Sequence, residues 1–233
     1  GCLQARLIAP EVTLIDDPRK IDGAQGYRKL GDQMPSEWLV AYSAETADGL
    51  RPTGLRLLGG RHQFIANARE IMASLLKRDV RLKLREGLIG PWRYEDKGLQ
   101  AWGWDAAARI DAAASAKAVT STPKFGVLGA YWLAWESLPF WPMVNGRTVG
   151  MGKQCWVYPT CAEWLGADSL RALILGAAGM DDREATALGV SRWRSERIGS
   201  SDYGGVLGWA MPLPARTSRV RGNTGRLASK RNI

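Results

Sequence analysis

Apolar residues recur at helical spacing most clearly in residues 61–78, "RHQFIANAREIMASLLKR". One face of the expected helix carries Phe64, Ala68, Ile71, Met72, Leu75 and Leu76. This spacing is typical of an amphipathic helix that buries that face in a core. A second helix is expected over about 79–88 and ends before Gly90 and Pro91, because neither residue continues a helix well.

The most aromatic stretch is "YWLAWESLPFWPM", residues 131–143, with three of the eleven tryptophans. Helical spacing over 125–138 places Leu128, Trp132, Trp135 and Leu138 on one face. The pattern predicts a buried helix that ends near Pro139, followed by an extended turn into Gly146 and Arg147. Trp141 is the tryptophan of this stretch that we leave out of the predicted core.

Three further helical segments are expected. Residues 35–49 show helical spacing with Ser36 as N-cap and Gly49 as the stop. Residues 168–180 form a short apolar helix capped by Asp168 and ending near Gly179, and residues 181–189 add one or two more turns. The Ala-rich residues 106–119 are compatible with either a helix or a linker.

The strand signals are fewer. Residues 1–15 alternate loosely and predict a strand broken at Pro10. "VSRWRSERI" (190–198) and "GGVLGWAMPLP" (204–214) predict two strands around a glycine-rich turn. We therefore expect an α+β fold: a mainly helical body, a small antiparallel sheet and a basic, flexible C-terminal arm.

Domain organisation follows from the same patterns. Residues 1–215 are expected to form a single globular region, and a sub-boundary would fall near 106–124. Residues 216–233 contain six Lys/Arg and no acidic or aromatic residue, which predicts a basic disordered tail.

Charge adds a functional expectation. The chain has 233 residues and a formal net charge of +9, and residues 188–233 hold nine Lys/Arg against two acidic residues. A basic end on a nearly neutral body favours a polyanionic partner such as nucleic acid. No apolar run is long enough to span a membrane and no signal peptide is evident, so we expect a cytoplasmic protein with no membrane partner.

The sequence contains no complete catalytic or cofactor-binding motif. "GRTVGMGKQ" (146–154) lacks the first glycine and the Ser/Thr of a phosphate loop, and His62 is the single histidine. The six-residue offset between Cys155 and Cys161 is wider than a zinc pair normally shows. No enzyme activity, metal or cofactor is expected. A metal nuclease using Asp16, Asp17 or Asp22 is kept as an alternative, although turn chemistry explains these aspartates better.

Basic residues interleaved with aromatic residues are the strongest candidate chemistry, since cations bind phosphates and aromatic rings stack on unpaired bases. They occur in "GPWRY", in "GRTVGMGKQCWVY" and in "SRWRSER". The alternative is that the tryptophans are core residues with arginines around them. The candidate nucleic-acid-binding residues are Arg61, Arg93, Arg147, Lys153, Arg192, Trp193, Arg194, Arg197, Arg216, Arg219 and Arg221.

Several stretches, taken in order, resemble the large subunit of the type I CRISPR interference complex, Cascade, of subtype I-U or I-G. The resemblance covers residues 55–175, about half of the chain, and residues 1–50 show no counterpart of that family's N-terminal region. The stretches are "LLGGRHQFIANAREI" (57–71), "GLIGPWRYED" (87–96), "WGWD" (102–105), "YWLAWESLPFWPMVNGRTVG" (131–150), "WVYPT" (156–160) and "LRALIL" (170–175).

The resemblance implies a non-catalytic DNA-binding subunit at the crRNA 5′ end of a ribonucleoprotein. Such a subunit contacts the protospacer-adjacent motif (PAM) and helps to open the duplex, while the guide RNA reads the sequence. The implied partners are crRNA, target double-stranded DNA, other Cas backbone subunits and a helicase-nuclease recruited in trans.

A crRNA-handle-binding subunit of a type I or type IV complex is the alternative. "APEVTLIDDPRKIDG" resembles the N-terminus of handle-binding subunits of type IV complexes, and "GSSDYGGVLGW" (199–209) would then be the glycine-rich loop beside the RNA.

Overall fold

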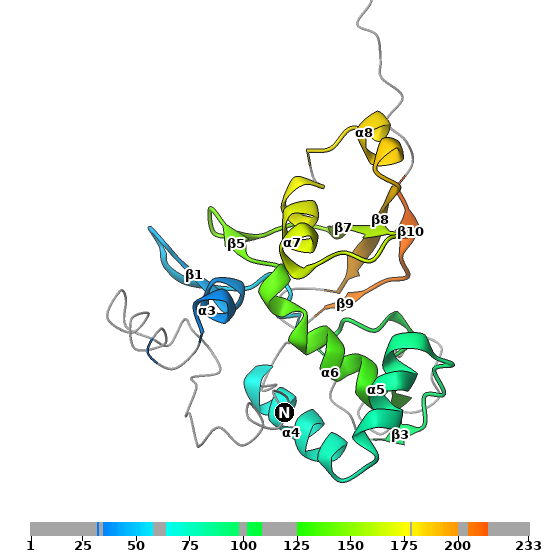
Figure 1. The fold of residues 1–233 in the computed structure, drawn as a ribbon. Coiled ribbons are helices and arrows are strands. Elements are labelled where there is room, and N and C mark those ends of the chain that lie inside the picture. The colour runs from blue at the N-terminus through cyan, green and yellow to red at the C-terminus, as the bar shows by residue number, and fades with distance from the viewer. Residues whose placement is uncertain are drawn as a thin grey trace, which may run out of the picture.

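The chain folds into a mixed α+β structure in which helices and short antiparallel sheets share one core (Figure 1). The computed structural model describes Asp32 and residues 35–57, 64–97, 102–108, 125–177, 179–199 and 205–213. The expected N-terminal strand and the expected tail at 216–233 lie outside these residues, as does most of 106–124.

Three helices form the lower part of Figure 1. Helix α4 spans Phe64–Leu76 and is confirmed as amphipathic, because Phe64, Ala68, Ile71 and Leu75 are buried. Leu76 is 47% exposed, so its predicted burial is wrong. It lies one helical step beyond Leu75, at the edge of the buried face.

Helix α5 spans Val80–Ile89 and confirms the second predicted helix. The Asp79 side chain caps it by accepting a hydrogen bond from the Leu82 backbone N–H at 3.0 Å. Gly90 ends it with a positive φ of 66°, a conformation that glycine adopts readily. Helix α5 packs along α6 through Gly87, and its Val80 and Leu84 side chains pack against the hydrophobic core.

The aromatic stretch forms α6 (Leu128–Glu136), the 3₁₀ helix η4 (Leu138–Phe140) and strand β5 (Met143–Val144), close to the prediction. Strand β6 (Arg147–Thr148) pairs with β5 through a tight turn at Asn145 and Gly146, both at positive φ. Trp141 is only 8% exposed, which contradicts its exclusion from the core. Its ring packs edge-on against Trp156, 4.6 Å between centroids, which residue spacing within 131–143 does not reveal.

The first described helix, α3 (Ser36–Tyr42), is shorter than predicted. Its N-cap is Pro35 rather than Ser36, and the chain turns at Ser43 into strand β1 (Ser43–Thr46), which pairs with β2 (Gly49–Pro52). Gly49 has a φ of 102° in this hairpin, so its function is to turn the chain between strands and not to end a helix.

The largest sheet has the order β10-β8-β7. Its central strand β8 (Val190–Ile198) was predicted and pairs antiparallel with β9 (Val206–Leu207) and β10 (Met211–Pro212). Its longest partner, β7 (Cys155–Cys161), was not predicted. Pro159 lies within β7, and an edge strand tolerates proline because one row of its backbone groups is unpaired.

Strands β3 (Asp96–Lys97) and β4 (Phe125–Gly126) form a separate short pair.

Two helices accompany this sheet (Figure 1). Helix α7 spans Ala167–Gly176, with Gly166 rather than Asp168 at its N-cap. Helix α8 (Asp182–Ala187) confirms the predicted extra turns and begins with a capping box between Asp181 and Glu184. The short 3₁₀ helix η2 (Ala106–Ala108) follows the "WGWD" stretch.

One aromatic cluster joins two helices to the "WGWD" stretch. Trp102 stacks on Trp104 at 4.6 Å and on Trp135 at 5.2 Å between ring centroids. Trp135 also contacts Trp38, at 5.3 Å, so α3, α6 and the "WGWD" stretch meet in one core. Among the described residues no helix has the length and apolarity required to cross a membrane.

Candidate nucleic-acid interface

A tight turn between β6 and β7 places two of the polar residues of the candidate site. The Gly152 backbone N–H donates to the Cys155 carbonyl at 2.7 Å, which closes the turn around Lys153 and Gln154. The Gln154 carbonyl then accepts from the Arg197 backbone N–H at 2.7 Å. These bonds fix the turn against the far end of β8, although about 40 residues separate the two segments in the sequence.

An open pocket of about 420 Å³ lies where the turn meets β8. Its lining residues are Lys153, Gln154, Arg194, Glu196, Arg197 and Gly199. Three of the sequence-predicted residues, Lys153, Arg194 and Arg197, therefore come together at one place. Three cations and one carboxylate give this pocket a net positive charge, which suits an anionic ligand.

The register of the sheet explains why Arg194 faces outward. Directly opposed residues of an antiparallel pair lie on the same face, and Arg194 is opposite Val157. The neighbouring pairs have the other orientation: Trp156 is opposite Ser195, and Trp156 packs against the hydrophobic core. Arg194 is thus on the face that points away from the core.

Ion pairing leaves most of the positive charge available. The Arg194 guanidinium contacts the Glu196 carboxylate at 2.9 Å, and both side chains are substantially exposed. An exposed pair of this kind is weak and is screened by salt. Within the described part of the chain, no carboxylate forms an ion pair with Lys153 or Arg197.

Two exposed apolar residues border this surface, and sequence reasoning missed both. Trp209 is 72% exposed and Met211 is 66% exposed. The Gly208 backbone N–H donates to the Glu196 carbonyl at 2.7 Å, and Met211 pairs with Arg194 in the sheet, so this edge runs beside the pocket. The sequence offers no local signal for their exposure, because the exposure of a residue in or next to a strand depends on which other elements pack over it.

Arg192 and Trp193, the centre of the predicted motif, have structural roles instead. The Arg192 side chain is 7% exposed, donates to the Met180 carbonyl at 2.8 Å and forms an ion pair with Asp182 at the start of α8. Trp193 is half-buried and donates from Nε1 to Thr160 Oγ1 at 2.8 Å. Both side chains are engaged within the fold, and we leave them out of the interface.

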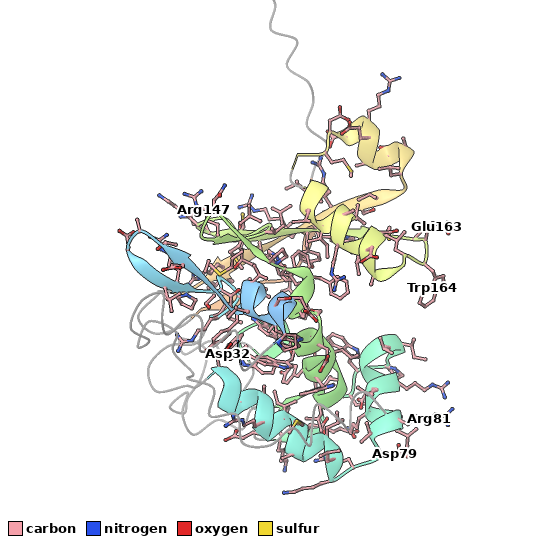
Figure 2. All side chains as sticks on the ribbon, turned by 60° about the vertical axis from the view of Figure 1, so that its left-hand side comes forward. Asp32, Asp79, Arg81, Arg147, Glu163 and Trp164 are labelled. Carbon is pink, nitrogen blue, oxygen red and sulfur yellow. The ribbon has the colours of Figure 1, made fainter. Side chains whose placement is uncertain are left out.

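The other predicted residues do not line the pocket. Arg93 is exposed in the loop after α5, where its backbone N–H donates to Glu86 Oε1 at 3.1 Å. Arg147 is exposed on the β5–β6 hairpin, on the side opposite Trp164 in Figure 2. Arg61, Arg216, Arg219 and Arg221 lie outside the described residues.

Metal and cofactor chemistry has no positive indication in the region that the structure describes. No group of three or more His, Cys, Asp or Glu side chains there could hold a metal ion. Asp16, Asp17 and Asp22, the aspartates of the nuclease alternative, are outside that region, as is His62.

Comparison with protein-family models, curated proteins and solved structures found no match to this chain. Function is therefore inferred from the side chains and their arrangement.

Proposed function

We propose that the chain binds nucleic acid at the pocket between the β6–β7 turn and β8, as a non-catalytic subunit of a CRISPR-Cas interference ribonucleoprotein. The observation that carries the binding proposal is the convergence of Lys153, Arg194 and Arg197 on one open pocket. Two separate segments supply these cations, and folding is required to bring them together.

The chemistry of the surface fits a sugar-phosphate backbone. Lys and Arg contacts to phosphates release counterions and supply most of the sequence-independent affinity. Trp209 offers an exposed ring beside the cations, and stacking of one unpaired base on an aromatic side chain is worth about 1–3 kcal/mol. Cations beside an exposed aromatic ring are the combination that single-stranded nucleic acid requires.

The narrower assignment, to a Cascade-type large subunit, is supported by the ordered sequence motifs. In the fold, Trp102, Trp104, Trp132 and Trp135 from these motifs lie in or against the core. On this proposal the motif residues stabilise the hydrophobic core, and the basic pocket on the surface binds the nucleic acid. On this proposal the partners are crRNA, target double-stranded DNA, Cas backbone subunits and a helicase-nuclease acting in trans, and the chain works in the cytoplasm.

The test is the salt dependence of binding. For the wild-type chain, the logarithm of affinity for duplex and single-stranded DNA should fall linearly with the logarithm of salt concentration. Replacing Lys153, Arg194 and Arg197 by glutamine should reduce that slope by about 2–3, because each lost phosphate contact removes about 0.7–0.9. Fluorescence anisotropy titrations over a series of salt concentrations measure this slope.

A matched control is Arg183→Gln, a neutralisation at an exposed position on α8 away from the pocket. It should leave the slope within error of the wild type. Equal losses in the triple variant and in a variant with three neutralised cations elsewhere would reject the pocket as the binding site. Co-purification with crRNA and a backbone subunit tests the ribonucleoprotein assignment separately.

The crRNA-handle-binding alternative is favoured by one observation. Gly199 lines the pocket, and Gly205 lies against the Arg197 side chain, so two glycines of the glycine-rich loop adjoin the basic residues. Competition between single-stranded handle RNA and a PAM-containing duplex distinguishes the two subunit types. Preference for the handle RNA would favour this alternative, and preference for the duplex would favour the large subunit.

A further inference from the structure

Helix α5 presents an apolar and basic face to solvent. No residue of this helix is buried, and Leu82, Leu88 and Ile89 are 61%, 69% and 71% exposed. Arg81 and Arg85 are exposed at positions that helical spacing places between these side chains. We name these five residues the α5 face. Exposed apolar side chains that share one helix face are typical of an interaction site.

A second apolar surface, of opposite charge, lies on the loop between β7 and α7 and on the first turn of α7. Trp164 is 101% exposed, and Leu165 beside it is also exposed. Glu163 and Asp168 flank them as exposed carboxylates. We name these four residues the Trp164 loop. A tryptophan that makes no packing contact of its own is the residue type most enriched among the anchors of protein interfaces.

The two surfaces are complementary in charge and alike in apolar content. Arginines border the leucines and isoleucine of the α5 face, whereas carboxylates border the tryptophan and leucine of the Trp164 loop. A nucleic acid would leave the aliphatic side chains of α5 without partners and would be repelled by Glu163 and Asp168. The occupant that matches both surfaces at once is a second copy of this chain.

The positions of the α5 face and the Trp164 loop allow two copies of the chain to form a closed dimer. In Figure 2, Glu163 and Trp164 project at the same edge of the molecule as Arg81. Two copies related by a two-fold axis can then make the same contact twice, which closes the assembly as a dimer. We propose that the Trp164 loop of each copy binds the α5 face of the other.

One existing contact would be exchanged on assembly. Asp168 forms an ion pair with Arg171 at 3.2 Å within the same chain, and the carboxylate is fully exposed. Exposed pairs of this kind contribute little to stability, so Asp168 is available to the arginines of another copy. The nucleic-acid pocket shares no residue with either surface, and the inference stands independently of the proposed function.

Sedimentation velocity of the full chain, freed of nucleic acid, tests the proposal. The mass should rise from monomer to dimer between about 1 and 100 μM protein, and the dimer should weaken at high salt. Trp164→Ser should raise the dimer dissociation constant by about tenfold or more, as expected for an interface anchor. Because the Trp164 side chain is fully exposed, the substitution should leave folding unchanged, and thermal unfolding checks this. Val144→Ser, at an exposed apolar position on the β5–β6 hairpin, is the matched control that should leave the dimer unchanged.

Charge reversal gives the sharpest readout. One variant carries Arg81→Glu and Arg85→Glu, and the other carries Glu163→Arg and Asp168→Arg. Each alone brings like charges together and should be monomeric, whereas an equimolar mixture restores opposite charges at both contacts and should form a heterodimer. A wild-type monomer at every concentration overturns the proposal, as does a dimer unaffected by these reversals or a mixture that stays monomeric.

Discussion

Gly87 of α5 and Gly129 of α6 lie against each other at the point where the two helices meet. A Cβ atom added to Gly87 would come within 2.6 Å of the Gly129 carbonyl carbon, and one added to Gly129 would overlap the Lys83 carbonyl oxygen. The backbones therefore approach more closely than any side chain would permit. This contact holds α5 in place although none of its residues is buried.

Gly129→Ala should destabilise the chain by about 1–3 kcal/mol or more, since overpacking forces the helices apart. Urea unfolding followed by circular dichroism measures the loss. Gly176→Ala is the control, because a Cβ there meets no atom within 4 Å. That substitution should be neutral or should stabilise the helix by about 0.5–1 kcal/mol. Equal effects of the two substitutions would contradict the close packing.

Asp96 is a buried carboxylate that joins three elements. It contacts Lys83 Nζ at 3.0 Å and Arg78 at 3.1 Å, and it accepts the Leu128 backbone N–H at 3.1 Å. Asp96→Ala should cost about 1–3 kcal/mol, because the buried Leu128 N–H would lose its acceptor and Lys83 would keep Glu86 as an ion-pair partner. Asp48→Ala, which removes an exposed ion pair with Arg51, should change the free energy of unfolding by less than about 1 kcal/mol. A loss at Asp96 no larger than that at Asp48 would show that burial does not matter here.

The Tyr94 and Tyr131 hydroxyls both donate to Asp105, at 3.4 and 2.9 Å. Burial, followed by the charge and hydrogen bond of Asp105, raises the pKa of Tyr94 to about 12 and that of Tyr131 well above its ordinary value. Both hydroxyls hold their protons more tightly in the folded chain. Their stabilisation is complete below pH 10, the ordinary pKa, and is lost as the pH rises toward 12.

The urea midpoint should thus fall steeply above pH 10, and less steeply in Tyr94→Phe. Absorbance titration of tyrosinate should show one late-ionising group fewer in Tyr94→Phe and in Tyr131→Phe than in the wild type. A variant with as many late-ionising groups as the wild type would contradict the shared contact with Asp105.

Arg192 and Arg194 are two residues apart in one strand, but they should respond differently to mutation. Arg192→Gln should lower the unfolding temperature, because it breaks contacts with Met180 and Asp182, while leaving the salt slope of DNA binding unchanged. Arg194→Gln should reduce the salt slope with little effect on stability. Differential scanning fluorimetry and anisotropy titrations separate the two outcomes, and the opposite assignment would contradict the proposed pocket.

Trp209→Ala should weaken binding of single-stranded DNA by about 1–3 kcal/mol and change duplex binding much less, since paired bases offer no free face for stacking. Its exposure makes it a direct reporter, because bound bases should quench its fluorescence. Loss of duplex and single-strand affinity in equal measure would argue against stacking.

Helices α4 and α6 could be predicted because local spacing alone marks their buried faces, whereas α5, which buries no residue, could be predicted from the Gly90 and Pro91 that end it. Strand β7 could not, since "CWVYPTC" contains Pro159 and its partner β8 begins about 30 residues later. The candidate site could be predicted only in part, because its residues also meet through contacts between distant parts of the sequence. Lys153, Arg194 and Arg197 were among the predicted binding residues, but only the fold reveals that they line one pocket. Only α8 reveals that Arg192 is enclosed, and only the register reveals that Trp193 faces the core side.

The contact between Trp38 and Trp135 has a consequence for how the chain reaches its structure. These rings are about 100 residues apart in sequence, so the stretch between them must close into a loop before the contact forms. Chains dominated by such distant contacts fold on slower timescales than helical bundles with local contacts. Although its clearest predicted elements are helices, this chain should fold on the millisecond-to-second timescale of sheet-rich domains, with its tryptophan fluorescence changing late.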